Sequence, residues 1–338
     1  MQMSYVGVGK DRHIETCLAR GVESLTGNGF EHYELVGDLP NFDFADIDLS
    51  TIFLGHRLDL PIMISSLTGG GRQSERINRN LAEAAQRLGL AMTVGSQRIM
   101  LEHPDTLPSF EVRRWAPDIL LMADLGLVHL NHGLNVEMCR QAVEAIGADG
   151  LALYVNPMHE AIQPNGMLDF SRLIEKLVNL LENFTYPVMI KEVGYGFSEV
   201  ALKKFRQCPI AAIDVAGMGG TDWGRIESGH ARVGHELELG VRTADSLMAA
   251  LQIMPHKVEV VASGGIRTGG DISKALAMGA KAVGMGLPFL RWAHDSADRV
   301  VKEVERLVEE LKLSMWYTGS RTLQELNGKI RLYGSPRV

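Results

Sequence analysis

Residues 258–286 read VEVVASGGIRTGGDISKALAMGAKAVGMG, and they contain one full strand–helix–strand pattern. The apolar run Val258–Ser263 leads through a glycine pair into Asp271–Met278, where apolar residues recur at helical spacing. A second apolar run, Lys281–Met285, follows directly. Near-continuous apolar runs of this length are typical of parallel strands that are buried on both faces. The stretch therefore predicts two neighbouring parallel strands joined by a helix that covers them.

The same alternation extends over most of the chain. Eight short apolar runs recur, at Pro61–Ser65, Ala91–Val94, Asp118–Ala123, Gly150–Val155, Pro187–Glu192, Ala211–Val215, Val258–Ser263 and Lys281–Met285. Amphipathic segments lie between them at Ser74–Leu88, Asn135–Ile146, Leu168–Leu181, Thr243–Leu251 and Asp271–Met278, and a longer helix is expected from about Phe289 to Leu313. Eight βα units predict the α/β class and a closed (β/α)₈ TIM barrel. An open doubly wound sheet is disfavoured because no GxGxxG motif follows the first run.

Length and composition favour one large folded domain. The chain has 338 residues, of which 46% are hydrophobic, and its formal net charge is -7. Residues 1–60 are expected to form an N-terminal extension or lid, and residues 61–338 the barrel. The mildly acidic charge disfavours nucleic-acid binding, and the sequence has neither a membrane-spanning apolar stretch nor a signal-peptide core. Three widely separated cysteines, Cys17, Cys139 and Cys208, predict reduced thiols in a cytoplasmic protein.

Glycines follow the last two predicted strands, at the barrel end where active sites of this fold lie. Gly264-Gly265, with Arg267 close by, comes after the seventh strand, and Gly286 comes after the eighth. Glycines here let backbone N–H groups approach a phosphate, and a following helix N-terminus adds its dipole. The plainer alternative is that they only make tight turns. The two glycine positions together with Arg267 favour a site for a single phosphate.

Lys191 ends the fifth predicted strand, so its ammonium is expected to point into the barrel mouth and must find an anion or shift its pKa. Three hypotheses remain open. Lys191 forms a structural ion pair, for example with Glu192 or Asp214; it is the cation beside the N1–C2 region of a flavin; or it is a Schiff-base lysine. Hydroxyl residues that suit a polar ring edge also follow the strands, at Ser66, Thr68, Ser96 and Thr221.

These motifs and several others together resemble one family. They are Lys10-Asp11-Arg12-His13, Leu67-Thr68-Gly69-Gly70, Gly95-Ser96-Gln97-Arg98, Asn156-Pro157, Glu160-Ala161-Ile162-Gln163-Pro164, Lys191-Glu192-Val193-Gly194, Gly219-Gly220-Thr221, Gly264-Gly265-Ile266-Arg267 and Lys274-Ala275-Leu276-Ala277. From about Lys10 to Gly319 the chain resembles the type 2 isopentenyl diphosphate isomerases. Members of that family depend on FMN and interconvert isopentenyl and dimethylallyl diphosphate.

The resemblance implies a role for each matching residue and for the two substituted positions that Asp124 and His159 occupy. It implies FMN contacts at Ser66, Leu67, Thr68, Ser96, Asp124, Lys191, Thr221, Gly265, Ile266, Arg267, Gly286 and Leu287. It implies substrate contacts at Lys10, Gln97, Arg98 and Asn156, and His159 stands at a further substrate-contact position of the family. Because an imidazole can titrate near neutral pH, we expect His159 to be the catalytic residue. It also implies that Glu160 binds a Mg²⁺ ion bridging to the substrate diphosphate, and that NADPH reduces the flavin. A cytoplasmic homotetramer or homo-octamer is expected on the same ground.

Several positions depart from the family pattern. They are Gly9, where the family has Arg; Tyr154, where it has His; His159, where it has Gln against the reacting alkene; and Asp124, where it has Asn beside the flavin. One hypothesis is an isomerase with an altered pocket. The second is an FMN-dependent oxidoreductase or isomerase that acts on another phosphorylated or carboxylated compound. A flavin-binding protein without enzymatic activity is the third, and the polar pair of His159 and Glu160 in the mouth argues against it.

Overall fold

Eight parallel strands form a closed barrel in the computed structural model, which describes residues 5–19, 21–163, 165–227 and 239–334. The strands follow one another around the barrel in chain order, and the last pairs with the first. They are β4 (Ile62–Ile64), β5 (Ala91–Thr93), β6 (Leu121–Gly126), β7 (Gly150–Tyr154), β8 (Val188–Lys191), β9 (Ala212–Asp214), β10 (Glu259–Ser263) and β11 (Ala282–Met285). The expected (β/α)₈ barrel is confirmed, and each predicted apolar run overlaps one of these strands.

The third barrel strand lies three residues later than the sequence indicates. The predicted run begins at Asp118, but Asp118 is exposed and accepts a hydrogen bond from the side chain of Gln86 on the outside of the barrel. The strand itself spans Leu121–Gly126. Asp124 therefore lies inside the strand, where the barrel fixes the direction of its side chain, instead of in the loop that follows.

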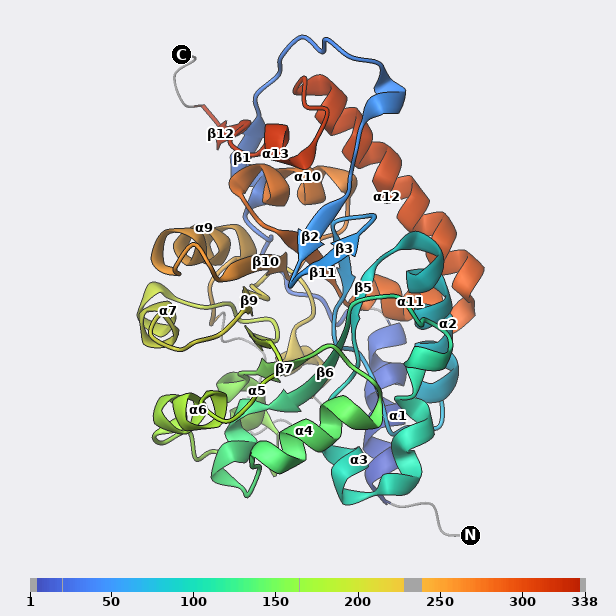
Figure 1. The fold of residues 1–338 in the computed structure, drawn as a ribbon, viewed down its shortest axis with the longest axis vertical. Coiled ribbons are helices and arrows are strands. Elements are labelled where there is room, and N and C mark those ends of the chain that lie inside the picture. Colours follow the sequence, from blue (N-terminus) through green and yellow to red (C-terminus); the bar gives the residue numbers. More distant parts are fainter. Residues whose placement is uncertain (1–4, 20, 164, 228–238, 335–338) are drawn as a thin grey trace.

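Helices surround the barrel (Figure 1). The longer ones are α2 (Ser74–Leu88), α4 (Val136–Ala145), α6 (Leu173–Leu181), α7 (Glu199–Phe205), α9 (Thr243–Ile253), α10 (Gly269–Met278), α11 (Leu287–Asp295) and α12 (Ala297–Tyr317). Shorter ones are α3 (Arg98–Glu102), α5 (Pro157–Ile162), α8 (Trp223–Ile226) and α13 (Leu323–Leu326), with 3₁₀ turns at Phe30–His32, Phe44–Asp46, Pro104–Ser109, Val112–Arg114 and Leu127–Asn131. None of the helices in the described residues is long and apolar enough to cross a membrane.

The sequence predicts one long terminal helix where the structure has two. Ser296 interrupts it with extended backbone (φ −167°, ψ 165°), and its hydroxyl accepts a hydrogen bond from the N–H of Arg299. Serine in this conformation is a preferred N-cap, so it ends α11 and begins α12. The sequence pattern also missed α7, which is only seven residues long.

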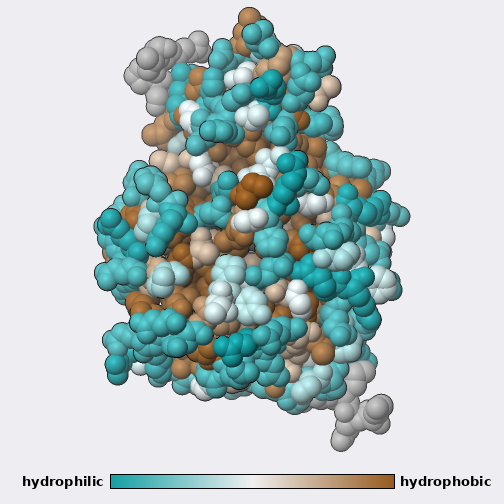
Figure 2. Space-filling view, viewed as in Figure 1, coloured by the Kyte–Doolittle hydropathy of each residue, from teal (hydrophilic) through white to brown (hydrophobic). Residues whose placement is uncertain are grey.

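The N-terminal extension reaches both ends of the barrel. Helix α1 (Tyr5–Leu18) contacts α8 and α11 and contributes side chains to the mouth at the carboxyl ends of the strands. The antiparallel hairpin of β2 (Thr51–Phe53) and β3 (His56–Leu58) packs into the opposite end, and Figure 1 shows it in front of the barrel. In the sequence between α1 and the hairpin lies β1 (Tyr33–Leu35), which pairs with β12 (Ile330–Leu332) near the C-terminus. Figure 2 shows the hairpin face as largely hydrophilic, with apolar residues among the polar ones.

An apolar layer of alternating large and small side chains fills the lower barrel. Going around the strands from β4 to β11, it consists of Met63, Ala91, Met122, Ala152, Met189, Ala212, Val261 and Ala282. Large and small side chains in alternation fit together in the layered interior of such barrels. Phe53 and Leu58 of the hairpin are fully buried against this layer and close its base.

A ring of polar residues lies directly above the apolar layer. Because side chains on a strand alternate in direction, the residue two positions further along each strand faces the same way. Those residues are Ser65, Thr93, Asp124, Tyr154, Lys191, Asp214, Ser263 and Gly284. Seven of the eight are polar, which a barrel used only for packing would not place there. We call these eight residues the polar ring; they form the floor of the mouth.

Replacing Leu58 with alanine should destabilise the protein by about 2–5 kcal/mol, because it opens a cavity at the sealed base. Ile52 provides a matched control, since it lies on the same hairpin but is 50% exposed. Ile52→Ala should cost well under about 1 kcal/mol. Urea unfolding measures both changes. Equal losses for the two variants would show that the hairpin does not seal the barrel.

Candidate active site

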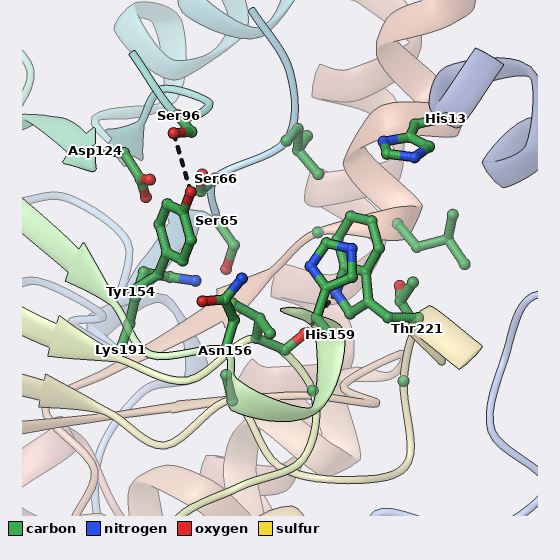
Figure 3. Close-up of a pocket in the computed structure, with 18 of the residues that line it drawn as sticks. His13, Ser65, Ser66, Ser96, Asp124, Tyr154, Asn156, His159, Lys191 and Thr221 are labelled. Carbon is green, nitrogen blue, oxygen red and sulfur yellow. Dashed lines mark hydrogen bonds between the residues drawn. The ribbon is translucent and has the colours of Figure 1, made fainter. Parts of the chain in front are cut away.

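A cavity of about 410 Å³ opens above the polar ring. Its walls are the loops that follow the barrel strands, and α1 contributes Lys10 and His13 from one side. Figure 3 shows His159 and Thr221 on one side of this space and Asp124, Tyr154 and Ser96 on the other. The cavity is therefore built at the barrel end where enzymes of this fold place their chemistry.

Buried polar atoms without partners gather around this cavity. Seven buried side-chain nitrogen or oxygen atoms of the described residues have no hydrogen bond. Six of the seven belong to the polar ring or the cavity wall: Ser65 Oγ, both carboxylate oxygens of Asp124, His129 Nδ1, Asn156 Oδ1 and Asp214 Oδ2. Native proteins rarely leave such atoms unsatisfied, and each costs about 1–3 kcal/mol. The grouping indicates a polar ligand that completes them.

Lys191 is a buried cation between two buried carboxyl groups of the ring. Its ammonium donates to the carbonyl oxygen of Glu192 at 3.1 Å and forms no ion pair with a carboxylate in the described part of the chain. Asp214 instead accepts from the hydroxyl of Ser263 at 2.7 Å. Burial raises the pKa of Asp124 to about 7, and the positive charge of Lys191 opposes that rise. The hypothesis of an ion pair between Lys191 and Glu192 or Asp214 is therefore wrong: Lys191 contacts the backbone carbonyl of Glu192 and neither carboxylate.

Glu192 orders the loop that follows β8. One oxygen of its carboxylate accepts hydrogen bonds from the N–H groups of four successive residues, 193–196, at 2.6–3.1 Å. Burial raises the pKa of Glu192 to about 7, and these four N–H groups act in the opposite direction. Val193 and Gly194 in this loop line the cavity. Glu192 thus holds part of the cavity wall without facing the cavity.

The glycine loops after β9, β10 and β11 pack backbone against backbone. A Cβ atom on Gly220 would come within 2.6 Å of the nitrogen of Gly265, and one on Gly265, which has φ +73°, would come within 2.5 Å of Gly219. Gly286 precedes α11, and an added Cβ there would meet only Leu67, at 3.4 Å. The N–H groups of Gly265 and Gly286 make no hydrogen bond in the described residues. This arrangement suits a phosphate group near the N-terminus of α11.

Arg267 is not free to bind a phosphate with its whole guanidinium group. It donates twice to Glu23, at 2.6 and 2.9 Å, and once to its neighbouring carbonyl. Its backbone N–H bonds to Asp271, which caps α10. Arg291 lies 3.5 Å from the other oxygen of Glu23. The arginine side chain therefore stands at the cavity edge in an ion-pair network that the sequence did not predict.

Asn156 and Glu160 form a second polar group on the cavity wall. The amide of Asn156 donates to one oxygen of Glu160 at 2.9 Å, and the other oxygen accepts from the N–H of Met167 at 2.7 Å. Asn156 Oδ1 is the partnerless atom noted above. No group of three or more His, Cys, Asp or Glu residues in the described ranges forms a metal site. A hard cation here would need most of its ligands from a bound substrate and water.

His159 stands in a fixed position above the cavity. Its ring stacks on Trp223 with a centroid distance of 4.1 Å. Its Nε2 contacts Gln163 at 2.6 Å and lies 3.4 Å from Glu227, and His13 from α1 approaches the same carboxylate oxygen at 3.0 Å. Burial lowers the pKa of His159, and Glu227 opposes that shift. Burial raises the pKa of Glu227, but the two histidines outweigh it and hold the pKa well below its usual value.

Two cations meet at the open end of the cavity. Lys10 on α1 and Arg98 on α3 both line it. Burial lowers the pKa of the Lys10 ammonium, and the charge of Arg98 lowers it further. Like charges held together in this way disfavour each other unless an anion lies between them. Glu102 lies 3.6 Å from Arg98 and offsets part of this repulsion, and the two cations together still favour an anion at this end of the cavity.

The structure brings together most residues predicted for the site. The cavity is lined by Lys10, Ser66, Leu67, Ser96, Arg98, Asp124, Asn156, His159, Glu160, Lys191, Thr221, Gly265, Ile266, Arg267, Gly286 and Leu287. Thr68 and Gln97 are not in this lining. Thr68 is buried and hydrogen-bonds to Ser74, at 2.8 Å. Gln97 donates its amide to the carbonyl of Ala142 and accepts from the N–H of Asp124, so its predicted contact with substrate is corrected to a structural role.

Other residues of the site were not found from the sequence. Glu23, Gln163, Glu227 and Trp223 act through contacts between segments far apart in the chain. His13 and Gln163 lie in quoted motifs, so position within a motif was an available signal for them. Glu23 and Glu227 lie in no motif or periodic pattern, and only the folded chain shows them.

Comparisons with known proteins agree with this geometry. The model of the family described as FMN-dependent dehydrogenase matches residues 135–332. The chain is 45% identical to the isopentenyl-diphosphate delta-isomerase of Mycolicibacterium vanbaalenii over 95% of both chains, and 43% identical to that of a Synechococcus species over 92% of both. Among solved structures, it resembles a mutant flavocytochrome b2 with pyruvate bound (TM-score 0.73, 19% identity, 97% of this chain and 86% of the other). It also resembles a mandelate oxidase with 2-hydroxy-phenylacetamide (TM-score 0.67, 19% identity, 97% and 98%). At such identities the two structures show a shared fold alone.

The buried carboxyl group of Asp124 should make the stability of the flavin-free protein depend on pH. Its pKa is about 7 when folded and about 3.9 when unfolded. Between these values the folded chain holds a proton that the unfolded chain has lost, so the free energy of unfolding falls as the pH rises, by a few kcal/mol in all. Asp124→Asn removes this titration. The variant should gain stability relative to the wild type between pH 4 and pH 8 in urea unfolding, and a difference that stays constant across that range would contradict the assignment.

Proposed function

The chain belongs to the isopentenyl-diphosphate delta-isomerase family, and we propose that it binds FMN in the barrel mouth and interconverts isopentenyl and dimethylallyl diphosphate. The observation that carries this proposal is the gathering of partnerless polar atoms around one cavity above the polar ring. Reduced FMN, with NADPH as the reductant, would supply the group that exchanges protons with the alkene. The conversion adds a proton at one carbon and removes one at another, so it leaves no net redox change.

The protein residues that would hold the flavin ring lie on the floor and wall of the cavity. Lys191 offers a buried positive charge, which favours an anionic form of a bound ring. Ser66, Ser96 and Thr221 offer hydroxyl groups that can donate or accept hydrogen bonds. Ser96 also contacts the phenol of Tyr154 at 3.2 Å, as Figure 3 shows. Tyr154 thereby limits the orientation of Ser96.

The glycine loops would take the phosphate of FMN. Within the part of the chain that the structure describes, the N–H groups of Gly265 and Gly286 have no acceptor, and α11 begins at Leu287. These groups suit one phosphate monoester, and the chain has no Rossmann fingerprint for a dinucleotide. Arg267 would contribute from the edge, where Glu23 fixes its direction.

Lys10 and Arg98 would bind the substrate diphosphate. The anion would relieve the repulsion between these two cations, which is a favourable use of binding energy at the open end of the site. Glu160 and the free oxygen of Asn156 would bind Mg²⁺, since both are the hard oxygen donors that this ion prefers. The diphosphate oxygens and water would complete its coordination.

His159 is the proposed catalytic residue of the protein. Its ring faces the cavity and is held by Trp223, Gln163 and Glu227. A ring fixed on one face and at its edge can exclude water from the reacting carbons and place a nitrogen close to them. The carboxylate of Glu227 would also stabilise a positive charge on the imidazole if His159 accepted a proton.

Anaerobic incubation with isopentenyl diphosphate, FMN, NADPH and Mg²⁺ tests this function directly. We expect formation of dimethylallyl diphosphate, detected by NMR, to require all of the added components. Glu160→Gln is the matched variant, because glutamine keeps the shape of the side chain and one of its two acceptor oxygens but carries no charge. It should raise the Mg²⁺ concentration needed for half-maximal rate at least about tenfold, since a charged ligand interaction is worth about 1.5–3 kcal/mol.

The controls separate the parts of the proposal. FMN binding by Glu160→Gln should match the wild type, because Glu160 lies away from the glycine loops. A flavin-loaded wild-type protein that leaves isopentenyl diphosphate unchanged under reducing conditions would overturn the isomerase activity. An unchanged Mg²⁺ requirement in Glu160→Gln would remove Glu160 from the metal site.

A further inference from the structure

Asp124 occupies a position that its strand fixes firmly. Gln97 binds the backbone of Asp124 on both sides, accepting from its N–H at 3.1 Å and donating its own N–H to the carbonyl at 2.8 Å. The side chain is fully buried and lines the cavity. Figure 3 shows its carboxyl group directed toward Ser66 and the phenol of Tyr154. The carboxyl group therefore cannot turn away from the mouth to find solvent.

The other buried carboxylates near the mouth accept hydrogen bonds within the described residues, whereas the two oxygens of Asp124 accept none there; the nearby hydroxyl of Ser66 acts only to lower the pKa of Asp124. Asp214 accepts from Ser263 at 2.7 Å and from the N–H of Ala216 at 3.3 Å. Glu192 accepts four backbone N–H groups, and Glu160 accepts from an amide and a backbone N–H. Both oxygens of Asp124 lack a partner among the described residues. Donors stabilise the ionised form, and Asp124 lacks them at both oxygens. Burial raises the pKa of Glu192 and of Asp214 as well, but Glu192 does not line the cavity and Asp214 keeps two donors.

The charges that face Asp124 come from three elements. Lys191 on β8 and Lys10 on α1 are cations that favour its ionised form, and the neutral phenol of Tyr154 on β7 lies beside it. Lys191 is shared with the second carboxyl group of the ring, Asp214. The ammonium of Lys191 already faces two carboxylates. The polar ring therefore offers no second cation to neutralise a further negative charge in the mouth.

We propose that Asp124 takes up a proton when the bound flavin is reduced, so that reduction consumes two protons in place of one. The inference rests on the proposed FMN site. The ring gains two electrons and one proton and becomes an anion, and the carboxylate of Asp124 gains the second proton and becomes neutral. The electrons come from a nicotinamide dinucleotide, whose hydride brings the ring's proton with it, or from an electrode in the test, in which case both protons come from solution. The negative charge that the flavin ring gains is then cancelled by the one that Asp124 loses. With an amide at position 124, the mouth would become more negative by one unit.

The expected pH range follows from the direction of the effect. Below about pH 7 the buried carboxyl group is already protonated before reduction, so it takes up nothing. Above that pH it is ionised beside the oxidised ring, and the added negative charge of the reduced ring raises its pKa. Coupled uptake is therefore expected from about pH 7 upward, until the pH exceeds the pKa in the reduced state.

The test is the midpoint potential of the FMN-loaded protein between pH 6 and pH 9, measured by spectroelectrochemistry. For a two-electron couple each proton adds about 30 mV per pH unit. We expect the wild type to change by about 60 mV per pH unit above pH 7, and Asp124→Asn by about 30 mV across the range. During reduction at an electrode, which supplies electrons alone, a pH indicator in weakly buffered solution should independently record about two protons per flavin for the wild type and about one for the variant.

Asp214→Asn is the control, because it removes the other ring carboxylate that faces Lys191. It should keep the steep dependence. Equal slopes in the wild type and Asp124→Asn, with FMN bound to both, would overturn this inference and leave the cofactor proposal intact. A slope of about 30 mV per pH unit in Asp214→Asn with one of about 60 mV in Asp124→Asn would overturn it as well, by assigning the proton to Asp214. Failure of the wild type to bind FMN would instead contradict the cofactor proposal on which the inference depends.

Discussion

Alternation of side-chain direction along the barrel strands is the constraint on which the site depends. Residues two positions apart face the same way, so an apolar layer beneath places a polar ring above it. The hairpin of β2 and β3 seals that layer from below with Phe53 and Leu58. Water is thereby excluded from under the ring, and its polar groups can be satisfied only from within the ring or from the mouth. The charges of Asp124, Lys191 and Asp214 owe their effect to this burial.

A second group of residues does not line the ligand site directly but fixes the position of the residues that do. Gln97 fixes the backbone of Asp124, Glu192 orders the loop after β8, Glu23 directs Arg267, and Glu227 joins His13 on α1 to His159 on α5. Each of these anchors uses charge or paired hydrogen bonds, which are directional and stronger than neutral contacts. The N-terminal extension takes part twice, since its hairpin closes the base and α1 forms part of the mouth.

The barrel strands were predictable because each is a near-continuous apolar run. The glycine loops were predictable because glycines gather after the strands, and at Gly220 and Gly265 only glycine fits the close backbone contact. The three-residue shift of β6 was not, since apolar residues precede the strand without belonging to it. Gln97 was misassigned because its motif also contains Ser96 and Arg98, which do line the cavity. Glu23 and Glu227 act across 244 and 68 residues of chain, and no local pattern records contacts of that kind.

The central claim is that the polar ring and the glycine loops together form a site for FMN. Titration of the flavin-free protein with FMN and with riboflavin, which lacks the phosphate, tests it most directly. We expect one FMN per chain and an affinity at least about a hundredfold above that of riboflavin, because two charge-assisted hydrogen bonds to a phosphate contribute about 3 kcal/mol or more. Equal affinities for the two compounds would contradict the phosphate site, and binding of neither would contradict the flavin site as a whole.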